Sequence, residues 1–204
     1  MLLLAGITTG LAVACKISTW PVAGVVGFAG LLYLEESESG PRLRLQTRLS
    51  TLLFLVASGF LAVLIFRVAQ PYAFKGPGFW NVGLSSSWLN TMKYIRQVVS
   101  GEIDSPPGHQ WTSRLPLVFP WVNMVFWGLG LPLGIAAWAG WGFMARALWR
   151  ERRLDAVLPW LWGTLYFLYQ ATQWVKSMRY LLPVYPVFTL FAAWGLIALA
   201  SAAK

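Results

Sequence analysis

Long apolar runs alternate with shorter polar segments along the whole chain. A helix needs about 20 apolar residues to cross a bilayer, and each run reaches or exceeds that length. The pattern predicts an all-α polytopic membrane protein with about five transmembrane helices in a single membrane domain, residues 1–204. The expected spans are 1–34 (broken), 50–68, 131–149, 156–175 and 180–203.

The first run, 1–34, is too long for one straight span at about 1.5 Å per residue. Lys16 interrupts it, so we expect a short broken or re-entrant helix over about 1–16 and a second helix up to residue 34. Gly6 and Gly10 are four residues apart, which is the spacing that lets a neighbouring helix approach closely.

The uncharged run 115–145 is also long for one span, and Pro120 and Pro132 interrupt it. Proline ends or kinks a helix because it lacks the backbone N–H and clashes with the preceding turn. We therefore expect a re-entrant or interfacial segment over about 117–129, followed by the span 131–149.

Residues 69–114 form the one long polar stretch, rich in Gly, Pro, Ser and Trp. Inside it, 87–100 places apolar residues at helical spacing with polar ones on the other side. This pattern predicts one amphipathic helix in an outer loop, lying on the membrane or packed on the bundle. Its apolar positions are Trp88, Met92, Ile95 and Val99.

Composition supports lipid as the main solvent and decides what the positive charge means. Only 11% of residues are charged, whereas soluble domains have about 25%. Sixteen Lys and Arg against seven Asp and Glu give a net charge of +9. The basic residues lie at the ends of apolar runs, where they contact lipid headgroups, so the partner is the bilayer and not nucleic acid.

The distribution of basic residues also predicts orientation. The densest cluster, 146–153, is expected inside by the positive-inside rule, which places the loop 69–114 outside. The chain is therefore expected to be a multi-pass integral protein of a bacterial cytoplasmic membrane. Cys15 is the only cysteine, so no disulfide forms within the chain.

Two groups of cations are candidates for anion binding. Lys16 at the helix break either snorkels to the interface or forms an anion site beside the helix ends. Lys176, Arg179 and Tyr180 form either a solvated turn or a phosphate clamp, since Arg can bind two phosphate oxygens at once.

The segment 101–114 gathers further candidates, each of which could equally be structural. The carboxylates are weak candidates for a catalytic base, and an indole beside an amide is a common sugar-binding combination. There are too few ligands to claim a metal site, so no cofactor is predicted and a divalent cation lacks support. The residues are Glu102, Asp104, His109, Gln110, Trp111 and Arg114.

Two motifs resemble one enzyme family. Gly10–Lys16, GLAVACK, resembles the GLA…K segment of membrane glycosyltransferases with the C-type fold, which include protein O-mannosyltransferases and lipid A aminoarabinose transferases. Arg179–Pro186, RYLLPVYP, resembles a late segment of the same enzymes. Phe66–Phe74 and Pro107–Trp111 resemble large bacterial members of family 39. The resemblance covers about residues 6–200.

The resemblance implies a glycosyltransferase that moves a sugar from a polyprenyl-phosphate donor to an acceptor glycan, lipid or protein at the extracytoplasmic face. Basic residues would stabilise the departing carrier phosphate. Lys16 and Arg179 are the first candidates, and the nearby cations and hydroxyl group add Lys176, Tyr180 and Arg114. His109, Gln110 and Trp111 are the candidates for contacts with the sugar or acceptor.

The chain departs from the family pattern at its start. The family's acidic outer loop precedes the GLA…K segment, and nothing before Gly6 can supply it. We therefore expect the C-terminal, carrier-binding portion of such an enzyme, inactive alone. The alternatives are a transporter or flippase segment and a non-catalytic membrane scaffold subunit.

Overall fold

The computed structural model describes residues 2–36, 41–76, 78–151 and 156–202. Within these ranges the regular elements are helical, apart from one isolated β-bridge between Phe74 and Leu84. The chain divides into two compact units, Met1–Lys93 and Tyr94–Lys204, and each is described by itself. The single membrane domain expected from the sequence stays a prediction.

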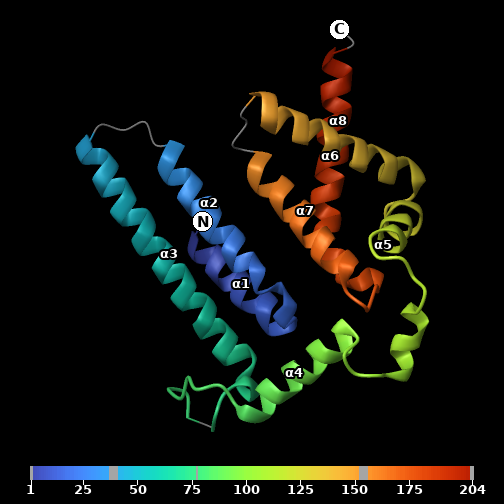
Figure 1. Ribbon diagram of the computed structural model, residues 1–204. Helices are drawn as coiled ribbons and strands as arrows, with labels where there is room; N and C mark the ends of the chain where they lie inside the picture. The colour runs from blue at the N-terminus through green and yellow to red at the C-terminus, as the bar shows by residue number, and fades with distance from the viewer. Residues whose placement is uncertain (1, 37–40, 77, 152–155, 203–204) are drawn as a thin grey trace. The chain divides into compact units, whose positions relative to one another are not determined.

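Helices occupy each of the expected spans, and Figure 1 shows their order along the chain. The first unit contains α1 (Leu2–Cys15), α2 (Pro21–Glu36), α3 (Pro41–Ala69) and the start of α4 (Ser86–Ser100). The second unit contains the end of α4, then α5 (Val118–Asn123), a π-helical turn (Met124–Gly128), α6 (Leu131–Glu151), α7 (Val157–Thr172) and α8 (Tyr185–Ala202).

The break expected at Lys16 is present. Lys16 has an extended backbone between α1 and the short 3₁₀ turn Ile17–Thr19, and Pro21 opens α2. Proline suits the first helical position because its missing N–H would have no intrahelical partner there. A proline within the long run thus starts a new helix.

The polar segment 35–49 lies between the first two expected spans, and much of it is helical in the structure. α3 begins at Pro41, so the Arg-rich residues before Arg48 form its first two turns. Arg, Leu and Gln are strong helix formers, and proline at the first position favours initiation. The polar residues mark where the apolar run begins. α3 nevertheless starts earlier, because these polar residues favour helix formation.

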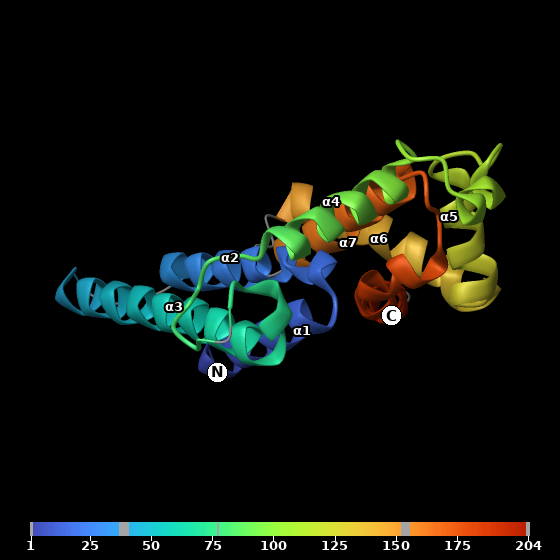
Figure 2. The ribbon, with the colours of Figure 1, turned by 90° about the horizontal axis from the view of Figure 1, so that it is seen from below.

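In the first unit α1 lies along α3 (Figures 1 and 2). Gly6 faces the carbonyl oxygen of Ser58, and a Cβ atom on Gly10 would lie 2.5 Å from the carbonyl oxygen of Ala62. No side chain could fit at either position without moving the backbone of α3. The close approach predicted from the spacing of Gly6 and Gly10 is confirmed.

Among the described residues, two helices are long and apolar enough to cross a bilayer: Arg48–Ala69 and Leu182–Ser201. Only 11% of the first stretch and 28% of the second is buried by the protein itself. Apolar helices left this uncovered fit a lipid environment. This confirms an all-helical chain with two candidate spans, while five spans remain a prediction.

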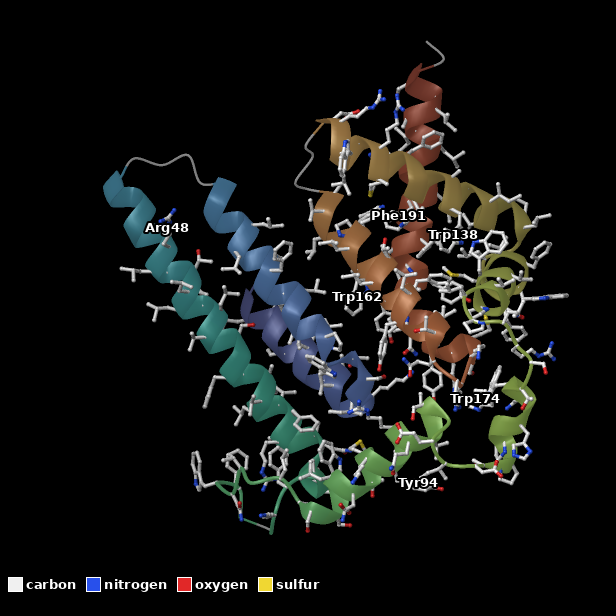
Figure 3. All side chains as sticks on the ribbon, in the orientation of Figure 1. Arg48, Tyr94, Trp138, Trp162, Trp174 and Phe191 are labelled. Atoms are coloured by element: carbon white, nitrogen blue, oxygen red, sulfur yellow. The ribbon has the colours of Figure 1, made fainter. Side chains whose placement is uncertain are left out.

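The core of the second unit forms where α6 crosses α8. Phe188 and Phe191 on α8 are fully buried, and the ring of Trp138 on α6 lies 4.7 Å from that of Phe188. Figure 3 labels Trp138 and Phe191 at this crossing. Gly140 and Gly195 meet there, since a Cβ on Gly195 would lie 2.8 Å from the Cα of Gly140.

Candidate functional site

A cavity of about 460 Å³ lies within the second unit. This volume is within the range of about 300–1,000 Å³ typical of small-molecule sites. Three segments line it: the last two turns of α4, the 3₁₀ turn Pro106–Trp111, and the chain between α7 and α8. The lining residues are Tyr94, Ile95, Val98, Val99, Ser105, Pro107, Gly108, Gln110, Trp111, Val175, Ser177, Arg179 and Tyr180.

The apolar wall of the cavity is one face of α4. Residues three and four positions apart share a helix face, and Val98 and Val99 have that spacing from Ile95. The structure confirms the helix expected over 87–100, with Ile95 and Val99 facing the same site. α4 ends at Gly101, whose φ of +84° is the left-handed conformation that glycine adopts readily.

Trp174 joins the three segments behind the cavity. A Cβ on Gly101 would lie 2.8 Å from Cγ of Trp174, and one on Gly108 would lie 3.4 Å from its Nε1. The indole therefore lies against both glycines, and Gly108 is buried. Figure 3 labels Trp174 and Tyr94 in this part of the second unit. The backbone N–H of Val175 donates to the carbonyl of Val99 at 3.2 Å, which holds the segment after α7 against α4.

The segment 175–177 lies outside any helix, and its side chains point to two different sides. Val175 and Ser177 line the cavity, whereas Lys176 does not. Ser177 has an extended backbone, and in an extended chain successive side chains point in opposite directions, which agrees with this alternation. Lys176 therefore does not share the cavity with Arg179, although the two are three residues apart.

Arg179 and Tyr180 supply the polar end of the cavity. The guanidinium carbon of Arg179 lies 5.2 Å from the centre of the Tyr180 ring, a cation–π contact that restrains the long side chain. Arg179 is exposed, so its charge is open to a ligand. A planar guanidinium binds phosphate oxygens in pairs.

Gln110 and Trp111 approach the same cavity from the 3₁₀ turn. The side-chain amide of Gln110 donates to the carbonyl of Pro107 at 2.8 Å, and the Trp111 ring lies 6.1 Å from that of Phe119. The structure thus brings together four of the residues selected from the sequence: Gln110, Trp111, Arg179 and Tyr180.

Lys176 is 5% exposed and packs against Trp174. Its Nζ donates to the Trp174 carbonyl at 3.2 Å and lies 5.5 Å from the centre of the Trp174 ring. Among the described residues no carboxylate forms an ion pair with it. Burial lowers the pKa of the Lys176 ammonium group, because removal from water disfavours the charged form.

We predict that Lys176→Met changes how stability depends on pH. In the wild type, the pKa of Lys176 in the folded state lies below its value in the unfolded chain, about 10.4. Between these two pKa values the unfolded chain therefore binds more protons than the folded chain. The wild type should gain stability relative to the variant as pH rises through that interval. Unfolding followed by tryptophan fluorescence in detergent, from pH 7 to 10.5, measures the difference. Parallel curves for the two proteins would contradict this prediction.

The remaining candidates of segment 101–114 lie outside the cavity lining. His109 and Asp104 form an exposed side-chain hydrogen bond, with Nε2 and Oδ1 2.5 Å apart. Glu102 accepts a hydrogen bond from the Ser100 hydroxyl at 3.0 Å, and the guanidinium of Arg114 lies 5.0 Å from the Phe119 ring centre. No group of three or more His, Cys, Asp or Glu that could hold a metal occurs in the described ranges.

Lys16 belongs to the first unit. Its backbone N–H donates to the carbonyl of Ala12 at 2.9 Å, and its own carbonyl accepts from the Thr19 hydroxyl at 2.8 Å. These bonds fix the break between α1 and α2. Since the cavity belongs to the second unit, a phosphate site shared by Lys16 and Arg179 stays a prediction.

Sequence reasoning missed Trp174 and Gly108, which hold the cavity wall. Glycine after two prolines indicates a turn and does not indicate a partner. The signal that could have helped is Trp174, two positions before Lys176, because an indole near the end of an apolar run can also pack on neighbouring backbone. No local feature of the sequence predicts that this indole contacts Gly101 and Gly108.

Comparison of the chain with protein-family models, with curated proteins and with solved structures finds no match.

Proposed function

We propose that the chain is the membrane-embedded, carrier-binding portion of a glycosyltransferase that moves a sugar from a polyprenyl-phosphate donor to an acceptor at the extracytoplasmic face. The observation that carries the proposal is the cavity lined by both Arg179–Tyr180 and Gln110–Trp111. The sequence selected Arg179 and Tyr180 as candidates for the carrier phosphate, and Gln110 and Trp111 as candidates for the sugar or acceptor.

The chemistry of the cavity supports an amphiphilic phosphorylated ligand. Arg179 provides positive charge for a phosphate, and Gln110 with Trp111 provides an amide and a ring for a sugar. Ile95, Val98 and Val99 provide an apolar wall for the start of a prenyl chain. A nucleotide or a free sugar would leave that wall uncovered.

The proposed arrangement has about five spans. Arg48–Ala69 and Leu182–Ser201 have the length and hydropathy of spans, and we propose that α1–α2, α6 and α7 complete the set, with α5 and the π-helical turn re-entrant or interfacial. The loop 69–114 would lie outside and 146–153 inside a bacterial cytoplasmic membrane. Arg152 and Arg153 of that inner cluster lie outside the described residues.

In the proposed reaction, an acceptor oxygen attacks the anomeric carbon of the sugar. The bond from that carbon to the carrier phosphate breaks, and the electron pair stays on the phosphate oxygen. Arg179 would stabilise this developing charge, which is electrostatic stabilisation of a leaving group. The acceptor proton passes to a base that we do not assign to Asp104 or Glu102, since both are exposed and outside the cavity lining.

Photo-crosslinking of the full chain in nanodiscs tests the proposal. We expect a polyprenyl phosphate with a diazirine on its first isoprene unit to label the α4 face at 94–99 and the segment 175–180. An excess of unmodified polyprenyl phosphate should abolish the labelling, and a prenyl alcohol should compete poorly. Labelling that is spread over all exposed helices, or that both compounds compete for equally, would count against a carrier site and favour a scaffold role.

A further inference from the structure

Arg67 in the last turn of α3 is a buried cation that the proposed glycosyl transfer does not use. Its side chain is 7% exposed, and Nη2 donates to the carbonyl of Gly78 at 2.8 Å. The guanidinium carbon lies 4.8 Å from the centre of the Phe74 ring and 6.0 Å from that of Phe79. Its Nε has no hydrogen-bond partner in the described part of the chain.

No anion compensates this charge within the described residues. The contact between basic and acidic side chains found there joins His109 and Asp104 in the second unit, and Arg67 has none. A buried cation is costly unless it is paired and fully hydrogen-bonded. One carbonyl and two aromatic rings satisfy the guanidinium only in part, because it carries five N–H groups.

The position of Arg67 identifies the kind of anion it would meet. The candidate span Arg48–Ala69 ends two residues after it, so Arg67 lies at the depth of the lipid headgroups when α3 crosses a bilayer. The following turn exposes 85% of Tyr72 and 86% of Trp80, and such aromatic residues concentrate at the membrane–water interface.

We propose that Arg67 binds the phosphate of an anionic phospholipid headgroup at the end of α3. The phosphate would accept hydrogen bonds from the guanidinium, including its unpartnered Nε. Because Nε is covered, Gly78 and Phe79 move aside on binding. One hydrogen bond, to the Gly78 carbonyl, and the contact with the Phe79 ring hold these two residues to Arg67.

The test uses the purified full chain in dodecyl maltoside, titrated with phosphatidylglycerol and followed by native mass spectrometry. We expect Arg67→Gln to weaken binding of the first lipid roughly tenfold, the loss expected for one charge-assisted contact. Arg67→Lys should retain part of the affinity. Arg150→Gln removes the same charge from an exposed position on α6 and should change the affinity less than about twofold. Equal affinity for Arg67→Gln and the wild type would overturn the proposal.

A second measurement rests on the wild-type chain and therefore does not depend on whether Arg67→Gln folds. In bilayers containing phosphatidylglycerol, the wild-type chain labelled with ¹⁵N-arginine should show a guanidinium nitrogen signal dephased by ³¹P in solid-state NMR, and the dephased signal that disappears in Arg67→Lys belongs to Arg67. A wild-type spectrum without it would refute phosphate contact. Inorganic phosphate competing as well as the lipid headgroup would show a free-phosphate site and overturn the lipid assignment.

Discussion

Arg179→Gln should weaken binding of a polyprenyl phosphate to the full chain about thirtyfold, which corresponds to about 2 kcal/mol. Glutamine keeps a hydrogen-bond donor on a shorter side chain and removes the charge and the planar fork. The guanidinium lies at the cavity and is restrained by the Tyr180 ring at 5.2 Å, so little side-chain entropy remains to be lost on binding. Isothermal titration calorimetry in detergent gives the dissociation constants.

Arg114→Gln is the matched control. Arg114 also lies over one aromatic ring, 5.0 Å from the centre of Phe119, and its loss changes net charge equally, but it does not line the cavity. We expect the affinity of Arg114→Gln for the polyprenyl phosphate to stay within about twofold of the wild-type value, as for an exposed charge outside the site. If both variants weakened binding equally, the effect would be general electrostatic attraction and the site at Arg179 would be wrong.

Most helix positions could be predicted, because the length of an apolar run and the polar residues that flank it determine where a helix lies. The break at Lys16 and the ends of α6 could be located, since a charge within an apolar run and a proline at Pro132 act through nearby backbone. The contact of Gly6 and Gly10 with α3 could also be anticipated, because small residues four apart mark a close helix pair.

The candidate site was less predictable because its residues meet through tertiary contacts. Lys176 points away from the cavity that Arg179 lines, and the non-helical segment 175–177 makes that separation possible. Trp111 and Arg179 line one cavity, beside which Trp174 lies against Gly101 and Gly108. No periodicity encodes a contact between segments some 65 residues apart.

Gly140→Ala should destabilise the protein by about 3 kcal/mol, at the upper end of what overpacking a core costs. A Cβ on Gly140 would overlap the carbonyl oxygen of Phe191. The obstacle is backbone of α8, which cannot rotate away as a flexible side chain could. α8 must therefore shift, and the shift disturbs the fully buried rings of Phe188 and Phe191.

Gly142→Ala on the same helix separates this steric effect from glycine's intrinsic flexibility. Nothing lies within 4 Å of a Cβ at Gly142, so alanine there meets no obstacle and should stabilise α6 by about 0.5–1 kcal/mol through its higher helix propensity. Unfolding by sodium dodecyl sulfate in mixed micelles, followed by circular dichroism, gives both free energies. Opposite signs for the two substitutions are the expected result. Destabilisation by both would mean that α6 needs glycine flexibility along its length, and two neutral results would mean that α6 and α8 do not cross this closely in the folded protein.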